Sequence, residues 1–202
     1  MYMEAKVAVS GSTLYVETPV TLAFDPGSKF TAGLLREGAE AIDAFTLALA
    51  YPDAGDPNAV LDDHEALRAY TDRITEQGLT LWDKHYAGKP VRVVIEAHNR
   101  PRRGGRYGNI PIRDWVIPRM VIAAVTSAFP GAVILPPQRA GGRHKVSNGG
   151  TGRPADYYPA VLIGRRPTSW GLNEAHDRVR DHEQAAYTLA GLAELAAAGR
   201  AA

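Results

Sequence analysis

The chain has 202 residues, with 23 Lys and Arg against 22 Asp and Glu, a formal net charge of +1, and no Cys. This composition is ordinary for a globular domain, and the lack of Cys excludes disulfide scaffolds, Cys-bearing zinc ribbons and Fe–S sites. No apolar run reaches the roughly 18–20 residues that span a bilayer, and the N-terminus lacks the charged-then-apolar order of a signal peptide. We therefore expect a single cytoplasmic domain over residues 1–202, with no membrane partner.

The first part of the chain has the alternation typical of a β-meander. Short β-prone runs are separated by turn signals, and one buried run ends in the turn sequence Asp25-Pro26-Gly27. Strands are expected here at residues 6–9, 13–16, 20–24, 31–35 and 44–49.

From Asp62 onward, helical and strand patterns alternate. Apolar residues recur at three-, four- and seven-residue steps over residues 62–87, which predicts an amphipathic helix with a candidate interruption near Gly78. Residues 91–95 are apolar on both faces apart from Arg92, as in a covered central strand. Beyond this strand we expect helices at residues 111–128 and 173–198 and short strands at residues 132–135 and 160–163. The pattern predicts an α/β fold.

Charge is strongly segregated along the chain. Residues 1–96 carry 8 basic and 15 acidic side chains, residues 97–155 carry 10 and 1, and residues 156–202 carry 5 and 6. The basic middle part contains two Gly-rich stretches, expected as loops at residues 99–109 and 139–153. Such a block favours a polyanionic partner, and the alternative is a solvated surface neutralised by the acidic first part. The candidate DNA-binding residues are Arg100, Arg102, Arg103, Arg106, Arg139, Arg143, Lys145 and Arg153.

Two of the expected strands end in an isolated acid, Asp25 in one and Glu96 in the other. Strand ends are where α/β sheets place their sites, and the last helix also begins with several acidic residues. If the two strands are neighbours and that helix packs beside them, three carboxylates converge. Converging carboxylates repel one another unless cations lie between them, so the pattern indicates a Mg²⁺ or Mn²⁺ site for phosphodiester cleavage. For either acid taken alone, the better explanation is an exposed residue at a strand boundary, and it is the combination of acids that favours a site.

Three segments resemble the motifs of RuvC-type Holliday-junction resolvases. Residues 22–27 (LAFDPG) resemble a strand closing in Asp-Pro-Gly, residues 93–96 (VVIE) a strand ending in Glu, and residues 181–187 (DHEQAAY) the C-terminal acidic helix. The resemblance implies an RNase H-like fold, in which helices flank a central mixed five-stranded sheet. It also implies a homodimer that resolves Holliday junctions or other branched DNA by paired nicking. Each active site would use two Mg²⁺ or Mn²⁺ ions, and the products would carry 5′-phosphate and 3′-hydroxyl ends.

The resemblance assigns both catalysis and metal binding to Asp25, Glu96 and Asp181, with His182 as the fourth residue. The third motif departs from the family pattern, because Gln184 or Ala185 stands where the family has its last Asp. Asp177, Glu183 and Gln184 therefore remain alternatives to His182 as the fourth metal ligand.

Three other functions share parts of this pattern. Another RNase H-like nuclease, acting on RNA–DNA hybrids or on flaps, would use the same carboxylates. The missing acid favours a catalytically degenerate protein that binds branched DNA. Sugar kinases and actin-like ATPases share the strand followed by Asp-Pro-Gly, but they need two such domains, which 202 residues do not hold, so no nucleotide cofactor is expected. The Ala-, Arg- and Gly-rich composition of a compact nuclease is compatible with a bacteriophage origin.

Overall fold

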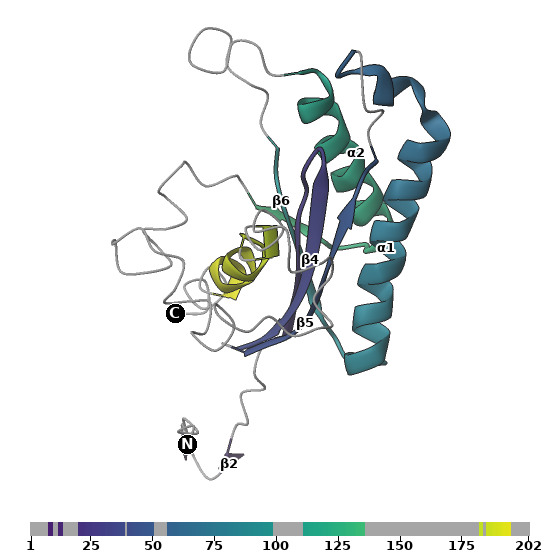
Figure 1. Ribbon diagram of the computed structural model, residues 1–202. Coiled ribbons are helices and arrows are strands. Elements are labelled where there is room, and N and C mark those ends of the chain that lie inside the picture. Colours follow the sequence, from purple (N-terminus) through teal and green to yellow (C-terminus); the bar gives the residue numbers. More distant parts are fainter. Residues whose placement is uncertain are drawn as a thin grey trace, which may run out of the picture.

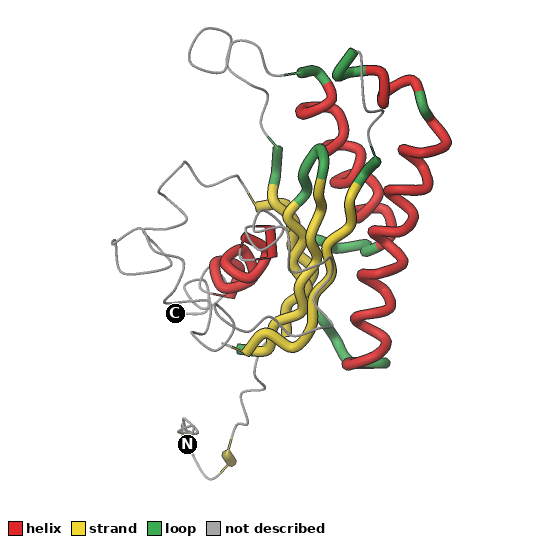
Figure 2. The backbone as a smooth tube through the Cα atoms, viewed as in Figure 1, coloured by secondary structure: helices red, strands yellow, loops and turns green. Residues whose placement is uncertain are grey.

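A computed structural model describes residues 8–9, 12–13, 20–38, 40–50, 56–98, 111–135, 182–183 and 185–194. A five-stranded sheet lies in the middle of these residues, with helices on both of its faces (Figures 1 and 2). The expected loops at residues 99–109 and 139–153, the expected strand at residues 160–163, and residues 173–181 and 195–198 of the last expected helix lie outside the described residues.

The sheet is mixed, with the strand order β5-β4-β3-β6-β7. Three antiparallel strands form a meander, and β6 then adds to β3 in parallel and is itself followed in parallel by β7. The strands are β3 (Val20–Asp25), β4 (Phe30–Glu37), β5 (Glu40–Ala48), β6 (Arg92–Glu96) and β7 (Val133–Leu135). This order and these directions are those of the expected RNase H-like fold, and the prediction of the fold class is confirmed. The first two strands, β1 (Ala8–Val9) and β2 (Ser12–Thr13), form a separate antiparallel pair.

Two long helices cover one face of the sheet. A short 3-10 helix η1 (Ala59–Asp62) leads into α1 (His64–Tyr86), where the Asp63 carboxylate caps the first turn by accepting from the Ala66 amide at 2.9 Å. Helix α2 (Arg113–Ala128) packs beside α1. The connection through α1 allows β6 to return parallel to β3. Within the described residues, no helix combines the length and the hydrophobicity needed to cross a bilayer.

The other face of the sheet is covered by the C-terminal helix, the name used here for residues 182–183 and 185–194, drawn in yellow in Figure 1. Small and branched side chains of the sheet pack under it, and these are Ala23, Leu34, Ala44 and Val94. The helix contributes Ala186, Tyr187, Leu189, Ala190 and Ala193 to the same cluster. Because side chains alternate between the two faces of a strand, Asp25, Thr46 and Glu96, which lie two positions after Ala23, Ala44 and Val94, also face this helix. That alternation decides which polar residues meet at the site.

Candidate active site

Asp25 and Glu96 end two neighbouring parallel strands, β3 and β6. Phe24 pairs with Ile95, so the next residue on each strand is one of the two acids. Both acids face the C-terminal helix, and they are only 8% and 9% exposed. They line one pocket of about 520 Å³ together with His182. The structure thus brings Asp25, Glu96 and His182 together at one end of the sheet.

The turn after β3 brings the C-terminal helix close to Asp25. Pro26 ends the ladder after Asp25, and the Gly27 amide donates to Thr31 Oγ1 at 3.3 Å, which closes the turn. A Cβ at Gly27 would lie 2.2 Å from the Phe30 carbonyl oxygen and 3.2 Å from His182 Cε1. Glycine therefore leaves room for the turn and for the His182 ring.

His182 is bonded directly to Asp25. Its Nδ1 lies 2.7 Å from Asp25 Oδ2. An ionised carboxylate only accepts hydrogen bonds, so Nδ1 carries the proton and donates. The second ring nitrogen of a neutral imidazole is then an acceptor. The Phe30 ring lies beside the imidazole, with 6.0 Å between the ring centroids.

Two further ionisable residues line the pocket. They are His98, two positions after Glu96, and Asp114 in the first turn of α2. Burial lowers the pKa of His98, against the opposing effect of its hydrogen bond with the Asp114 backbone. Burial thus favours the neutral form of His98. The available signal for Asp114 was that it is the only carboxylate of the basic segment 97–155.

Glu183, an alternative fourth ligand, does not line this pocket. Its side chain is fully buried over β5, where Thr46 Oγ1 donates to Glu183 Oε1 at 2.9 Å. Asp177, Asp181 and Gln184 lie outside the described residues, as do all eight candidate DNA-binding residues.

A second polar group fixes the other end of the C-terminal helix. Arg36, 5% exposed on β4, stacks on the Tyr187 ring with 4.3 Å between the guanidinium carbon and the ring centroid. It also pairs with Glu194 at 3.4 Å and donates to the Gly38 carbonyl oxygen. Burial raises the pKa of Glu194, while Arg36 and Arg92 act to lower it. The helix is therefore attached to the sheet at both ends.

The donor groups of the pocket fit a hard divalent cation. Such ions prefer carboxylate oxygens, and two nearly buried carboxylates share this pocket. Within the described residues, no three His, Asp or Glu side chains are close enough to form a metal site by themselves. Asp181, the residue expected to complete the donor set, directly precedes the described helix.

No protein-family model matches the chain, and no curated protein matches its sequence. Among solved structures, the chain is similar to Thermus thermophilus RuvC in complex with a Holliday junction substrate, with a TM-score of 0.49 and 13% identity over 85% of this chain and 90% of that chain. A second Thermus thermophilus RuvC structure gives 0.43 and 15% over the same shares. The Aquifex aeolicus PPX-GPPA enzyme gives 0.36 and 12%, over 62% of this chain and 38% of that chain. These identities are low, so the chemistry of the pocket has to follow from its own residues.

Proposed function

We propose that this protein is a divalent-metal-dependent endonuclease that cuts branched DNA, four-way junctions included, by paired nicking. The observation that carries the proposal is the pair Asp25 and Glu96, which end adjacent parallel strands in one pocket with His182 bonded to Asp25. The substrate class rests on the resemblance of the three sequence motifs and on the basic segment 97–155.

Asp25, Glu96 and Asp181 would hold the ions, with His182 as the fourth candidate ligand. When bound, Mg²⁺ or Mn²⁺ supplies an activated water and stabilises charge on the phosphate that is cut. Asp25 also accepts a hydrogen bond from His182 Nδ1, which fixes the orientation and tautomer of the ring. Because both carboxylates are nearly buried, their negative charge acts on a ligand with little screening by water.

The remaining parts of the proposal concern DNA binding and assembly. The Arg residues at 100–106 follow Glu96 closely in sequence, so we assign them to phosphates beside the scissile bond. The Arg and Lys residues at 139–153 would bind a second arm of the junction. Two symmetric nicks require two active sites, and the proposal therefore includes a homodimer.

The test is cleavage of a panel of substrates by the purified protein, namely a four-way junction, a flap, a linear duplex and an RNA–DNA hybrid. With Mn²⁺ or Mg²⁺ we expect nicking of the junction, and EDTA should stop it. Asp25→Asn or Glu96→Gln should lower the cleavage rate by roughly 10²-fold or more, which is the typical effect of removing one preorganised electrostatic group from an active site. Both variants should still bind the junction. The control Asp72→Asn changes an exposed carboxylate on α1 and should cleave normally.

Three results would redirect the proposal. Cleavage that persists in both active-site variants would remove the metal-site assignment. Preference for the hybrid or the flap would indicate another kind of RNase H-like nuclease. Junction binding without cleavage, together with no Mn²⁺ binding by calorimetry, would indicate a degenerate binding protein.

A further inference from the structure

Two adjacent residues at the start of the C-terminal helix bind different strands of the sheet. His182 Nδ1 lies 2.7 Å from Asp25 Oδ2 on β3, and Glu183 Oε1 lies 2.9 Å from Thr46 Oγ1 on β5. Consecutive residues of an α-helix are about 100° apart around its axis. Two such bonds therefore fix the rotation of this turn, which one bond alone would leave adjustable.

The sheet register separates the two bonds by a defined span. Asp25 pairs with Ala32, and Ala32 pairs with Thr46, so the three residues form one row across β3, β4 and β5. Residues paired in this way point to the same face of the sheet. Asp25 and Thr46 are thus two strand spacings apart, about 10 Å, and both face the C-terminal helix.

Packing alone does not explain a carboxyl group at position 183. Glu183 is fully buried, and burying a polar group costs free energy unless its hydrogen bonds are satisfied. Other residues of the helix that face the sheet, such as Ala186 and Ala190, are apolar. The bond to Thr46 gives the buried carboxyl group a specific partner and gives the helix a specific orientation.

We propose that Glu183 is a positioning residue: through its hydrogen bond with Thr46 it holds the first turn of the C-terminal helix in the rotation that aims His182 at Asp25. Glu183 then acts on catalysis without touching substrate or metal. The role in cleavage rests on the proposed nuclease function, whereas the role in placing the imidazole does not.

The experiment compares Thr46→Val, which keeps the side-chain shape and removes the hydroxyl, with Thr46→Ser, which retains it. The first readout is the low-field proton resonance of His182 Nδ1 in the metal-free protein, assigned by its absence from His182→Ala. The second is the Mn²⁺-dependent cleavage rate on a four-way junction, together with junction affinity. Thr21→Val is the matched control, because Thr21 is buried on the same sheet face in the row with Arg36 and Arg92, near the other end of the helix.

We expect Thr46→Val to lose or shift the His182 resonance and to cleave roughly 10- to 100-fold more slowly, as is typical for partners that orient an active-site group, with junction affinity unchanged. Thr46→Ser should restore the resonance and the rate, and Thr21→Val should leave both as in the original protein. An unaltered resonance in folded Thr46→Val would overturn the proposal. If the original protein cleaves none of the DNA substrates, the nuclease proposal fails while the resonance still decides the positioning role.

A second variant separates positioning from stability. Glu183→Met combined with Thr46→Val replaces both members of the buried pair with apolar side chains of similar size, so that no buried hydroxyl or carboxyl is left without its partner. We expect this double variant to melt close to the temperature of the original protein and still to lose the His182 resonance. A merely structural role for Glu183 predicts an intact resonance in this stable variant. That result would contradict the proposal even if Thr46→Val does not fold.

Discussion

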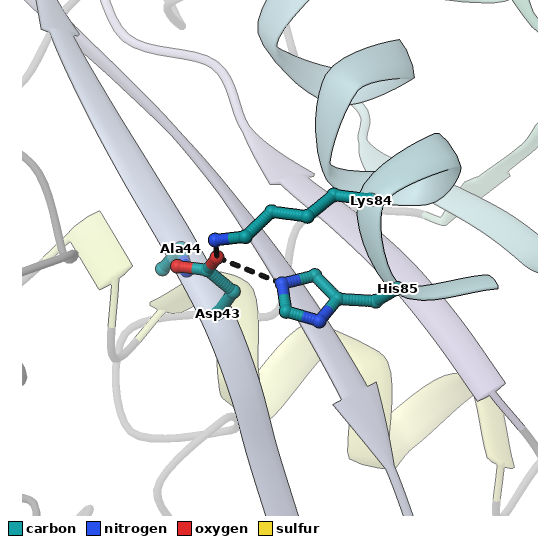
Figure 3. A network of polar contacts seen from close by, with 4 residues as sticks. All are labelled: Asp43, Ala44, Lys84 and His85. Atoms are coloured by element: carbon teal, nitrogen blue, oxygen red, sulfur yellow. Dashed lines mark hydrogen bonds and ion pairs between the residues drawn. The ribbon is translucent and has the colours of Figure 1, made fainter. Parts of the chain in front are cut away.

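Asp43 on β5 is a buried carboxylate that faces α1, and two basic residues of that helix bind it (Figure 3). Lys84 Nζ lies 2.8 Å and His85 Nε2 2.9 Å from Asp43 Oδ2, and the Ala44 amide donates to Oδ1 at 2.9 Å. Burial acts to raise the pKa of Asp43, but these hydrogen bonds outweigh it and hold the pKa below its ordinary value. The ionised form of Asp43 therefore stabilises the packing of α1 on the sheet.

The lowered pKa predicts how stability depends on pH. The contribution of such a carboxylate is complete above its pKa in the unfolded chain, about 3.9, and is lost as pH falls through the lower pKa of the folded state. Asp43→Asn should lower the free energy of unfolding by about 1–3 kcal/mol at pH 7, the range for hydrogen bonds to a charged group. In urea unfolding at pH 3, that difference should be smaller.

Asp72→Asn is the control for this measurement, because the Asp72 side chain is 59% exposed and pairs with an exposed Arg68. It should change stability by less than about 0.5 kcal/mol at both pH values. A destabilisation by Asp43→Asn that is equally large at pH 7 and pH 3 would show that the charge of Asp43 is not what holds α1.

Single residues differ in how far the sequence predicts them. Asp25 and Glu96 were predictable because each ends a short apolar run, and strand ends are recognisable locally. The bond between Thr46 and Glu183 joins residues 137 positions apart. The sequence around either residue does not indicate this hydrogen bond, because the partner of a buried polar group depends on the tertiary structure and not on the local sequence pattern. Asp114 stands out in the sequence as the only carboxylate of residues 97–155, but its place in the pocket depends on how α2 packs.

At the scale of elements, Gly78 illustrates the difference between a local preference and packing. Glycine weakens a helix, which made it a candidate interruption, yet α1 continues through it. A Cβ at this position would lie 2.6 Å from Phe24 Cζ and 3.2 Å from Phe129 Cζ. Gly78 therefore serves the close approach of α1 to the aromatic core.

We predict that Gly78→Ala destabilises the protein in spite of its better helix propensity. Alanine gains about 1 kcal/mol in a helix interior, whereas overpacking a core typically costs about 1–3 kcal/mol. Phe24 is fully buried and packs against the Phe45 and Phe129 rings, so its ring has little room to move. Thermal unfolding should show a lower melting temperature for Gly78→Ala, and no decrease for the exposed control Gln77→Ala. A higher melting temperature for Gly78→Ala would show that the aromatic side chains around Gly78 move to make room for the methyl group.

Element bounds were less predictable than the existence of the elements. The strand expected at residues 44–49 begins at Glu40, because Glu40 pairs with Glu37 directly across the turn after β4. The helix expected at residues 62–87 begins at His64, after the cap at Asp63 and a separate 3-10 turn. The first residue of β5 is set by its pairing partner, and the first residue of α1 is set by its cap. Hydrophobic periodicity gives no information about pairing partners or caps.

At the scale of the whole molecule, the pairing of β3 with β6 decides where the site forms. The sequence alone gives the order of the elements, and the expected sheet followed from the family resemblance. The parallel pairing brings Asp25 beside a residue 71 positions later, which no local signal predicts. The uneven charge, in contrast, is readable from the sequence, and its consequence for binding can be tested without further structural knowledge.

Neutralising two arginines of the basic segment, Arg102→Gln with Arg103→Gln, should weaken junction binding on every sequence alike. Each phosphate contact releases counterions from the DNA on binding, so a variant that lacks a contact releases fewer of them. The slope of log affinity against log salt concentration should therefore flatten by roughly one unit per lost contact. Binding measured at several salt concentrations gives this slope. The matched control is Arg68→Gln with Arg73→Gln, which removes the same charge from exposed positions of α1, on the sheet face away from the C-terminal helix. An equal effect of both pairs would mean that only the net charge matters. An unchanged slope in the Arg102 and Arg103 variant would show that this segment does not contact DNA.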